Sequence, residues 1–356
     1  MALGSLLKKE LHWSRHNALA LLFVLLLLPT VFAATSVAFQ HVIPRDAPVA
    51  VTPQDDTVTE DDVTFVKGAI TLFSDPEIVE ETADARRALR REEVYAVIQV
   101  PPNITDPDEE NATFVFTVDG SIVPFTEASK AIRNVMGFYL QRFLPADVTV
   151  ERVVVGTSNT LSEYLVPIFL LAITMLFAFT YVPYNLATEA NVLDRLRVEA
   201  SLESVLWAKL VYFAILMLVP VGVFAALASW MGYAVTAVAP GAVIAIVLTF
   251  VILSAVSMAI MVVTQFSTLG RFLNVVILLG LLGFGGLAYP LGYFSPLRKL
   301  LVQFVPVYYS MVVTRSSMLK GVPLSVYADI LLGLAGVAVL ALLVLKLSAV
   351  YYRRTV

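Results

Sequence analysis

Six long apolar stretches determine most of what this chain can fold into. They cover residues 18–39, 164–184, 206–231, 242–265, 272–290 and 325–350, and almost no ionisable residue lies inside them. A helix of about 20 apolar residues, rising about 1.5 Å per residue, crosses a hydrocarbon core roughly 30 Å thick. A composition with 58% hydrophobic and 15% charged residues agrees with this interpretation. The sequence therefore predicts a polytopic α-helical membrane protein with six transmembrane helices.

The charged residues are concentrated between the first two stretches. Residues 41–155 hold 21 of the 28 acids but only 10 of the 24 Lys and Arg, which gives this segment a net charge of −11. Short alternating patterns predict strands at 49–56, 93–100, 113–120 and 148–156, and charged periodic patterns predict helices at 77–91 and 127–143. We expect a mixed α/β domain at 40–160, inserted between the first and second membrane helices. Its acidity makes nucleic acid a poor partner.

The orientation follows from the basic residues near the ends of the spans. One face is expected to hold Lys8, Lys9, Arg15, Arg195, Arg197, Lys209, Arg271, Lys346, Arg353 and Arg354. The opposite face has only Arg298, Lys299, Arg315 and Lys320 in its short loops. We therefore expect a multi-pass protein of the plasma membrane with both termini in the cytoplasm and residues 40–160 outside the cell. The stretch at 18–39 is longer than the apolar core of a signal peptide, although cleavage there stays an alternative.

The residues needed for bond chemistry are missing from the sequence. There is no cysteine, and the three histidines, His12, His16 and His41, all lie toward the N-terminal end of the chain. No Ser/His/Asp set, calcium-loop spacing or phosphate loop of the form GxxxxGK[ST] is present. We therefore expect no catalytic site, no metal site and no cofactor in this chain. If the chain moves a substrate uphill, the energy has to come from a partner.

Two segments on the cytoplasmic face are candidates for contacting such a partner. Residues 1–17 predict an amphipathic interfacial helix, in which Leu3, Leu6, Leu7 and Leu11 lie on one face and Lys8, Lys9 and Glu10 on the other. An ordinary basic flank is the alternative. Residues 185–208 alternate leucines with charges and predict short amphipathic helices that dock into a groove on a partner. A structural turn with solvated charges is the alternative there.

A third segment, at 291–323, is expected on the outer side of the membrane. It is too long for a tight turn and too apolar for a free loop. Irregular backbone at membrane depth has to be covered by protein or line a cavity. The sequence predicts a re-entrant segment here and makes it a candidate gate.

The order of these features resembles the permease subunits of ABC-2 type transporters, in the branch with a large extracellular domain between the first and second membrane helices. The resemblance rests on five motifs in the same order. They are EVYAVIQVPPN at 93–103 with FTVDGS at 116–121, LVP at 165–167, Glu189 with VLDRL at 192–196, Lys209, and the segment from GGLAYP through Pro306 and Arg315 to Gly321. The chain departs from the family pattern at Ala190-Asn191 and Glu199-Ala200, where a second acid, a glycine and a proline are usual.

The resemblance implies a homodimer, or a pair of similar permeases, bound to two cytoplasmic ABC ATPase subunits, which would hold ATP and Mg. The substrate would be expelled outward through the membrane, whose lipid surrounds the helices. By this resemblance, ATPase coupling would involve Glu189, Asp194, Leu196 and Glu203. An outer gate would involve Pro290, Pro306 and Arg315. Two other functions stay open at this point: a membrane-anchored sensor or scaffold with an extracellular ligand-binding domain, and a membrane enzyme.

Overall fold

The computed structural model describes residues 3–16, 18, 47–71, 74–106, 111–199, 201–287, 300 and 302–355, with the backbone alone at 3, 127, 191–199, 283, 284 and 355. The chain divides into two compact units. The helical unit holds the N-terminal helix and the described residues within Leu165–Leu287 and Leu301–Val356. The α/β unit holds the described residues within Val37–Tyr164.

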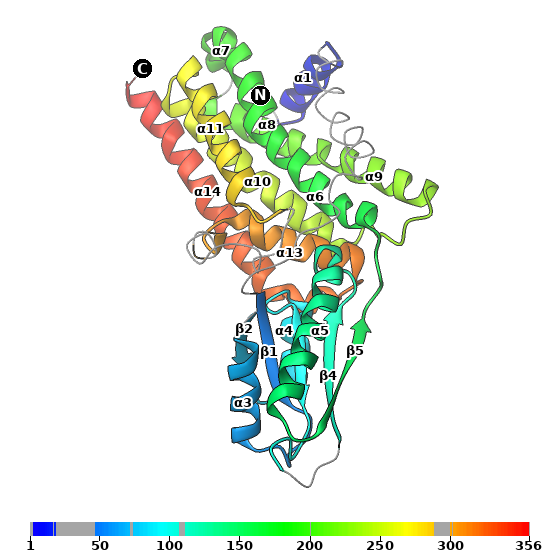
Figure 1. Cartoon of the computed structure of the whole chain (residues 1–356). Coiled ribbons are helices and arrows are strands. Elements are labelled where there is room, and N and C mark those ends of the chain that lie inside the picture. The colour runs from blue at the N-terminus through cyan, green and yellow to red at the C-terminus, as the bar shows by residue number, and fades with distance from the viewer. Residues whose placement is uncertain are drawn as a thin grey trace. The chain divides into compact units, whose positions relative to one another are not determined.

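A five-stranded sheet forms the centre of the α/β unit (Figure 1). The strands are β1 (Ala47–Pro53), β2 (Ser74–Ile78), β3 (Ala96–Val100), β4 (Asn111–Asp119) and β5 (Asp147–Val155). Their order across the sheet is β2-β1-β3-β4-β5, and only the β3–β4 pair is antiparallel. Parallel pairs need long crossovers, and helices supply these between β1, β2 and β3 and between β4 and β5.

Helices cover both faces of this sheet. They are α3 (Glu60–Ile70), α4 (Thr82–Arg90) and α5 (Val123–Phe143). Because neighbouring side chains of a strand point to opposite faces, Val49 and Val51 of β1 belong to the main core with α3 and α5, whereas Ala50 packs in a smaller core with Ala85 and Leu89 of α4. Two hydrophobic layers therefore hold the α/β unit together.

The acidic run at 60–62 begins helix α3. Thr59 is its N-cap and accepts a hydrogen bond from the Asp62 amide at 3.2 Å, while the Asp62 carboxylate accepts from the Thr59 hydroxyl at 2.7 Å. The second oxygen of Asp62 accepts from the Thr105 hydroxyl at 3.1 Å. Acids in a first turn also stabilise the positive end of the helix dipole. These carboxylates thus have a structural role in capping the helix.

The strands predicted at 49–56, 93–100, 113–120 and 148–156 are confirmed as β1, β3, β4 and β5, and the acidic turn after β1 is present. In that turn the carboxylate of Asp55 accepts from the Thr57 hydroxyl and from the Thr57 amide, and these bonds lower the pKa of Asp55 below its ordinary value. The helix predicted at 77–91 is wrong in its first part, because 74–78 form strand β2. Helix α3 was not predicted.

The helical unit begins with α1 (Leu3–His16), and after the α/β segment it continues with one long helix. This helix consists of α6 (Leu161–Leu176), a π-helical turn η1 (Phe177–Tyr181) and α7 (Val182–Glu199). Pro183 follows the π turn, separated from it by Val182. A proline inside a helix lacks an amide donor and clashes with the carbonyl four residues earlier, here that of Phe179, so the wider turn accommodates it.

The remaining helices are α8 (Leu202–Leu216), α9 (Leu218–Trp230), α10 (Pro240–Val263), α11 (Thr268–Phe284), α13 (Pro306–Leu319), the 3-10 turn η3 (Leu324–Tyr327) and α14 (Ala328–Thr355). Helix α10 lies centrally, and α8, α11, α13 and α14 pack against it (Figure 1). The break between α8 and α9 lies at Met217, three residues before Pro220.

Four helices of the described residues are long and apolar enough to cross a membrane: Leu161–Ala190, Leu202–Trp230, Pro240–Val263 and Leu324–Arg354. They correspond to four of the six predicted spans. The span predicted at 272–290 overlaps α11, whose apolar part, Thr268–Leu282, is shorter. The span predicted at 18–39 lies outside the described residues, apart from Ala18. The structure therefore supports a membrane protein with an α/β sheet region, and the number six stays a prediction.

Small residues bring α10 and α13 together. A Cβ atom at Gly241 would lie 2.4 Å from the Ser317 hydroxyl, so the two backbones approach more closely there than a larger residue allows. Two turns further along α10, Thr249 donates to the Ser310 hydroxyl of α13. Close approach through small residues and hydroxyl pairs is typical of helix packing in membranes.

Candidate functional site: a buried ionic cluster

Five polar side chains from three helices meet inside the helical unit. We call them the ionic cluster: Lys9 and Glu10 of α1, Asn185 and Glu189 of α7, and Lys209 of α8. Lys209 and Asn185 are fully buried, Glu10 and Glu189 are 2% and 4% exposed, and only Lys9 reaches the surface. Two ammonium groups face two carboxylates, so the cluster is neutral overall.

Lys209 is the centre of the ionic cluster. Its ammonium nitrogen lies 3.1 and 3.2 Å from the two carboxylate oxygens of Glu10 and 3.0 Å from Oε1 of Glu189. It also donates to the side-chain oxygen of Asn185. Its hydrogen bonds therefore go to the side chains of Glu10 and Asn185, and Glu189 is its second ion-pair partner. The second oxygen of Glu189 accepts from Lys9 at 2.8 Å, which closes the network between α1, α7 and α8.

Burial makes these contacts energetically important. A buried charge costs several kcal/mol unless it is paired and hydrogen-bonded, and an ionisable residue inside an apolar helix marks a functional site by default. The sequence analysis placed Lys209 among the basic residues flanking a span. The structure corrects this, because Lys209 lies within α8 with no exposed surface. The detectable signal is a lysine inside the apolar run LWAKLVYFAIL.

A layer of aromatic rings adjoins the ionic cluster. Phe177 stacks on Tyr181 within the π turn, with ring centroids 4.9 Å apart, and Phe213 of α8 packs edge-on against both. Trp13 of α1 contacts Tyr181 edge-on at 6.5 Å. Aromatic pairs of this geometry add about 0.5–1.5 kcal/mol each beyond burial. Helix α1 is therefore fixed to the π turn and to α7 and α8 by both charges and rings.

The packed face of α1 differs from the predicted one. Leu6, Glu10 and Ser14, spaced four residues apart, are buried against the protein, whereas Leu11 is 63% exposed. The sequence analysis placed Glu10 with the lysines on the polar face, because its partner Lys209 is far away in the sequence.

The other predicted coupling residues lie near the turn between α7 and α8. Asp194 and Leu196 are on α7, in the part whose side chains are outside the described set. Glu203, in the first turn of α8, accepts from Arg353 near the end of α14. This pair and the ionic cluster place α1, the α7–α8 turn and the C-terminal end of α14 at one end of the helical unit (Figure 1).

The residues predicted for an outer gate are only partly described. Pro290 lies outside the described residues. Pro306 starts α13, where a proline needs no amide partner, and Arg315 of the same helix is 1% exposed. The Arg315 guanidinium donates to the Leu287 carbonyl at 3.0 Å. Arg315 thus connects α13 to the backbone that follows α11.

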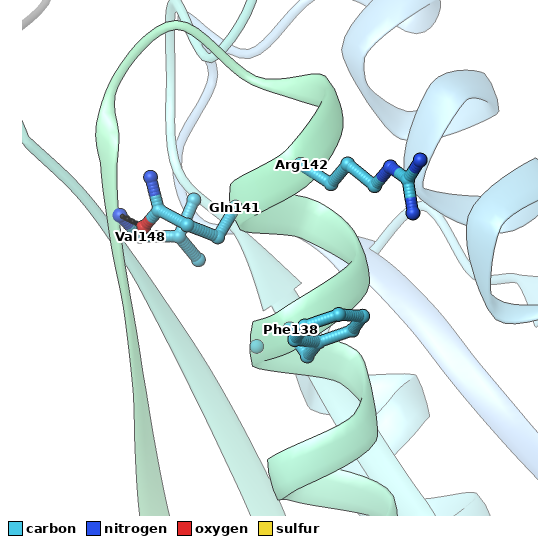
Figure 2. Close-up of a pocket in the computed structure, with 5 residues that line it drawn as sticks. Phe138, Gln141, Arg142 and Val148 are labelled. Atoms are coloured by element: carbon cyan, nitrogen blue, oxygen red, sulfur yellow. Dashed lines mark hydrogen bonds between the residues drawn. The ribbon is translucent and has the colours of Figure 1, made fainter.

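The α/β unit carries an open groove between α5 and β5, shown in Figure 2. It is lined by Gly137, Phe138, Gln141, Arg142 and Val148, and its volume is about 480 Å³. Gln141 points toward β5, where its side-chain oxygen accepts from the Val148 amide at 2.7 Å, whereas Phe138 and Arg142 point away from that strand (Figure 2). The hydrogen bond fixes the end of α5 to β5, and the lining holds no acid or nucleophile.

Among the described residues, no three His, Asp or Glu side chains gather at a spacing that holds a metal ion. The ionic cluster itself pairs each carboxylate with an ammonium group. These pairs attach α1, α7 and α8 to one another.

Comparison with known proteins gives one match. The model of a family described as ABC-2 family transporter protein matches residues 19–346, which include the described strands of the α/β unit and most of the helical unit. No curated protein and no solved structure matches the chain.

Proposed function

The chain belongs to the ABC-2 family of transporter proteins, and from this membership we propose that it is the permease subunit of an ATP-driven exporter. The family is a membrane transport component of ABC transporters, which implies an ATPase subunit as partner. In our proposal two copies of this chain form a homodimer in the plasma membrane. Two cytoplasmic ATPase subunits bind ATP and Mg and drive a substrate outward.

The ionic cluster is the observation that carries the coupling part of this proposal. A push on the α7–α8 turn has to reach the membrane helices to open a path for substrate. Lys209 and Glu189 lock α7 to α8, and Glu10 and Lys9 add α1 to the same body. Since α7 continues without interruption into η1 and α6, movement of the turn is transmitted along a span.

We assign two different roles to the predicted coupling residues. Asp194, Leu196 and Glu203 lie on the α7–α8 hairpin and would contact the ATPase. Glu189 is 4% exposed and bonded to both lysines, so its carboxylate is not offered to a partner. It acts as a positioning residue that holds α7 against α1 and α8.

The outer gate is proposed at the opposite end of the helical unit from the α7–α8 turn. Arg315 ties α13 to the Leu287 carbonyl, and Pro306 fixes where α13 begins. Rupture of the Arg315–Leu287 bond would let α13 move relative to α11. Pro290 belongs to this gate by resemblance alone.

The orientation in the membrane is also part of the proposal. Helix α1, the α7–α8 turn and the end of α14 lie at one end of the helical unit and carry most of the basic residues near the spans. That end would face the cytoplasm with both termini, and the α/β segment at 40–160 would lie outside the cell.

Copurification tests the proposal. The tagged chain is isolated from membranes of its native host in mild detergent, and the eluate is assayed for ATP hydrolysis and for a protein labelled by a photoreactive ATP analogue. We expect an ATP-hydrolysing subunit with the parent chain, and reduced recovery with Asp194→Arg or Glu203→Arg. Asp56→Arg, on the α/β unit, is the control with the same change of charge. Repeated recovery of the chain without any ATPase would remove the proposal's source of energy.

A further inference from the structure

We propose that the outward face of α1 binds the headgroups of anionic phospholipids. This goes beyond the proposed function and rests on it only in requiring that the helical unit lie in a bilayer. The inference depends on how charges are sorted around α1 and on the depth at which the helix lies.

The two sides of α1 differ in charge. The helix has one acid, Glu10, and this residue is buried and bound to Lys209. The exposed residues are Gly4, Ser5, Lys8, Leu11, His12, Arg15 and His16. Because the negative charge of this helix is turned inward and neutralised, the outward face carries the positive charges of Lys8 and Arg15 and no acid. An anionic layer is the complementary surface for such a face.

Two exposed aromatic residues indicate the depth of α1. Tyr184, next to Asn185 of the ionic cluster, is 45% exposed, and Trp207, two residues before Lys209, is 42% exposed. Exposed Tyr and Trp on membrane helices collect at the level of the lipid headgroups. Since Lys209 contacts Glu10, helix α1 lies at that same level.

The exposed face also combines charge with an apolar side chain. Leu11 is 63% exposed between Lys8 and Arg15 on consecutive turns. Helix α1 ends at His16, directly before the apolar sequence at 18–39. A basic helix with an exposed leucine beside an apolar stretch suits a layer that offers both phosphate and hydrocarbon. An acidic protein surface would complement the charges, but Leu11 would gain less there.

Lipid retention by the intact chain tests the inference. The purified full-length chain is delipidated in mild detergent and titrated with phosphatidylglycerol or phosphatidylcholine of identical acyl chains, and bound lipid is counted by native mass spectrometry. Each basic side chain at an anionic surface contributes a factor of about five in binding. With Lys8 and Arg15 both contributing, we expect phosphatidylglycerol to bind the parent at least about 25-fold more tightly than phosphatidylcholine.

Matched variants locate the site. Lys8→Gln/Arg15→Gln should weaken phosphatidylglycerol binding by about 25-fold and leave phosphatidylcholine unchanged. Lys8→Arg/Arg15→Lys should keep the preference, and so should Lys130→Gln/Arg142→Gln, which removes the same charges from α5. Both altered side chains of α1 are exposed, and an unchanged melting temperature verifies the fold.

Equal binding of the two lipids by the parent would overturn the inference. The same result would be expected if an acidic protein, and not a lipid, bound the outward face of α1. Retained preference in Lys8→Gln/Arg15→Gln, or its loss in the α5 control, would overturn it as well. None of these measurements involves an ATPase or a transported substrate, so failure here is distinguishable from failure of the proposed function.

Discussion

Lys209 and Glu10 are 199 positions apart in the sequence, yet the ammonium of one lies 3.1 and 3.2 Å from the carboxylate oxygens of the other. Removing one partner of a buried ion pair costs about 3–5 kcal/mol, because the remaining charge stays buried. We expect Lys209→Met to lower the melting temperature of the purified chain strongly. Adding Glu10→Gln leaves Lys9 paired with Glu189 and should restore much of the loss. Equal losses in the single and double variants would contradict this charge balance.

The pair between Glu203 and Arg353 should behave differently. These side chains are 19% and 51% exposed, and exposed ion pairs contribute about 0–1 kcal/mol. Arg353→Gln is therefore expected to change thermal stability by less than about 1 kcal/mol. Differential scanning fluorimetry of Arg353→Gln and Lys209→Met side by side compares the thermal stability of the two variants. A loss as large as that of Lys209→Met would show that the end of α14 contributes more to stability than its exposure indicates.

Packing of α10 against α13 depends on the missing side chain at Gly241. A Cβ there would lie 2.4 Å from the Ser317 hydroxyl and 3.3 Å from the Ser317 Cβ. Overpacking of this kind costs about 1–3 kcal/mol, so Gly241→Val should destabilise the chain by about that amount. Gly241→Ala combined with Ser317→Ala removes the clashing hydroxyl and should be milder than Gly241→Ala alone. Gly222→Val, at a glycine with no neighbouring atom within 4 Å, is the control.

The cap at Thr59 gives a prediction for the α/β unit. Thr59→Ala removes the hydroxyl that accepts from the Asp62 amide, a loss of about 1 kcal/mol. Amide hydrogen exchange in the first turn of α3 should become faster. Thr64→Ala makes the same chemical change at an exposed position within α3 and should leave exchange at the first turn unchanged. Equal effects of the two substitutions would show that the cap is not what protects this turn.

The proposed orientation is testable because the chain has no cysteine. Single cysteines at Asp56 and Arg354, both exposed, report on the α/β unit and on the end of α14. With a membrane-impermeant maleimide on intact cells, we expect labelling at position 56 and none at 354 until the cells are opened. Labelling of both positions in intact cells would exclude the proposed arrangement.

Family membership and much of the secondary structure were predictable from the sequence. The resemblance to ABC-2 permeases is confirmed by the match over residues 19–346, whereas its branch with a large extracellular domain stays a prediction. Strand β3 was recognisable because its apolar residues face both cores, and β4 because every second residue from Ala112 to Val118 is apolar and lies in the main core. Strand β2 was not recognisable, because it is an edge strand that carries charged residues and Pro76. Such residues are typical of edge strands, but they also resemble the start of a helix.

The ionic cluster was hidden from the sequence for a different reason. Lys209 has the local pattern of a basic residue flanking a span, and Glu10 has that of a solvated acid. Only the tertiary fold brings these two residues and Glu189 together. The resemblance therefore implied a docking role for Glu189, and the charge pattern placed Lys209 among the basic residues near the ends of the spans. A lysine within an apolar helix is costly unless it is paired, and this cost indicates that Lys209 has a buried partner.

The π turn at Phe177–Tyr181 has a consequence for how relatives should be aligned. A π turn closes its hydrogen bonds over one residue more than an α-helical turn, so the five residues Phe177–Tyr181 advance the helix by about as much rotation as four α-helical residues. A homologous chain with a one-position gap here and an uninterrupted α-helix would therefore still direct the residues aligned with Asn185 and Glu189 toward Lys209. A one-position gap elsewhere in this helix would instead turn them by about 100° and break the attachment of the N-terminal helix.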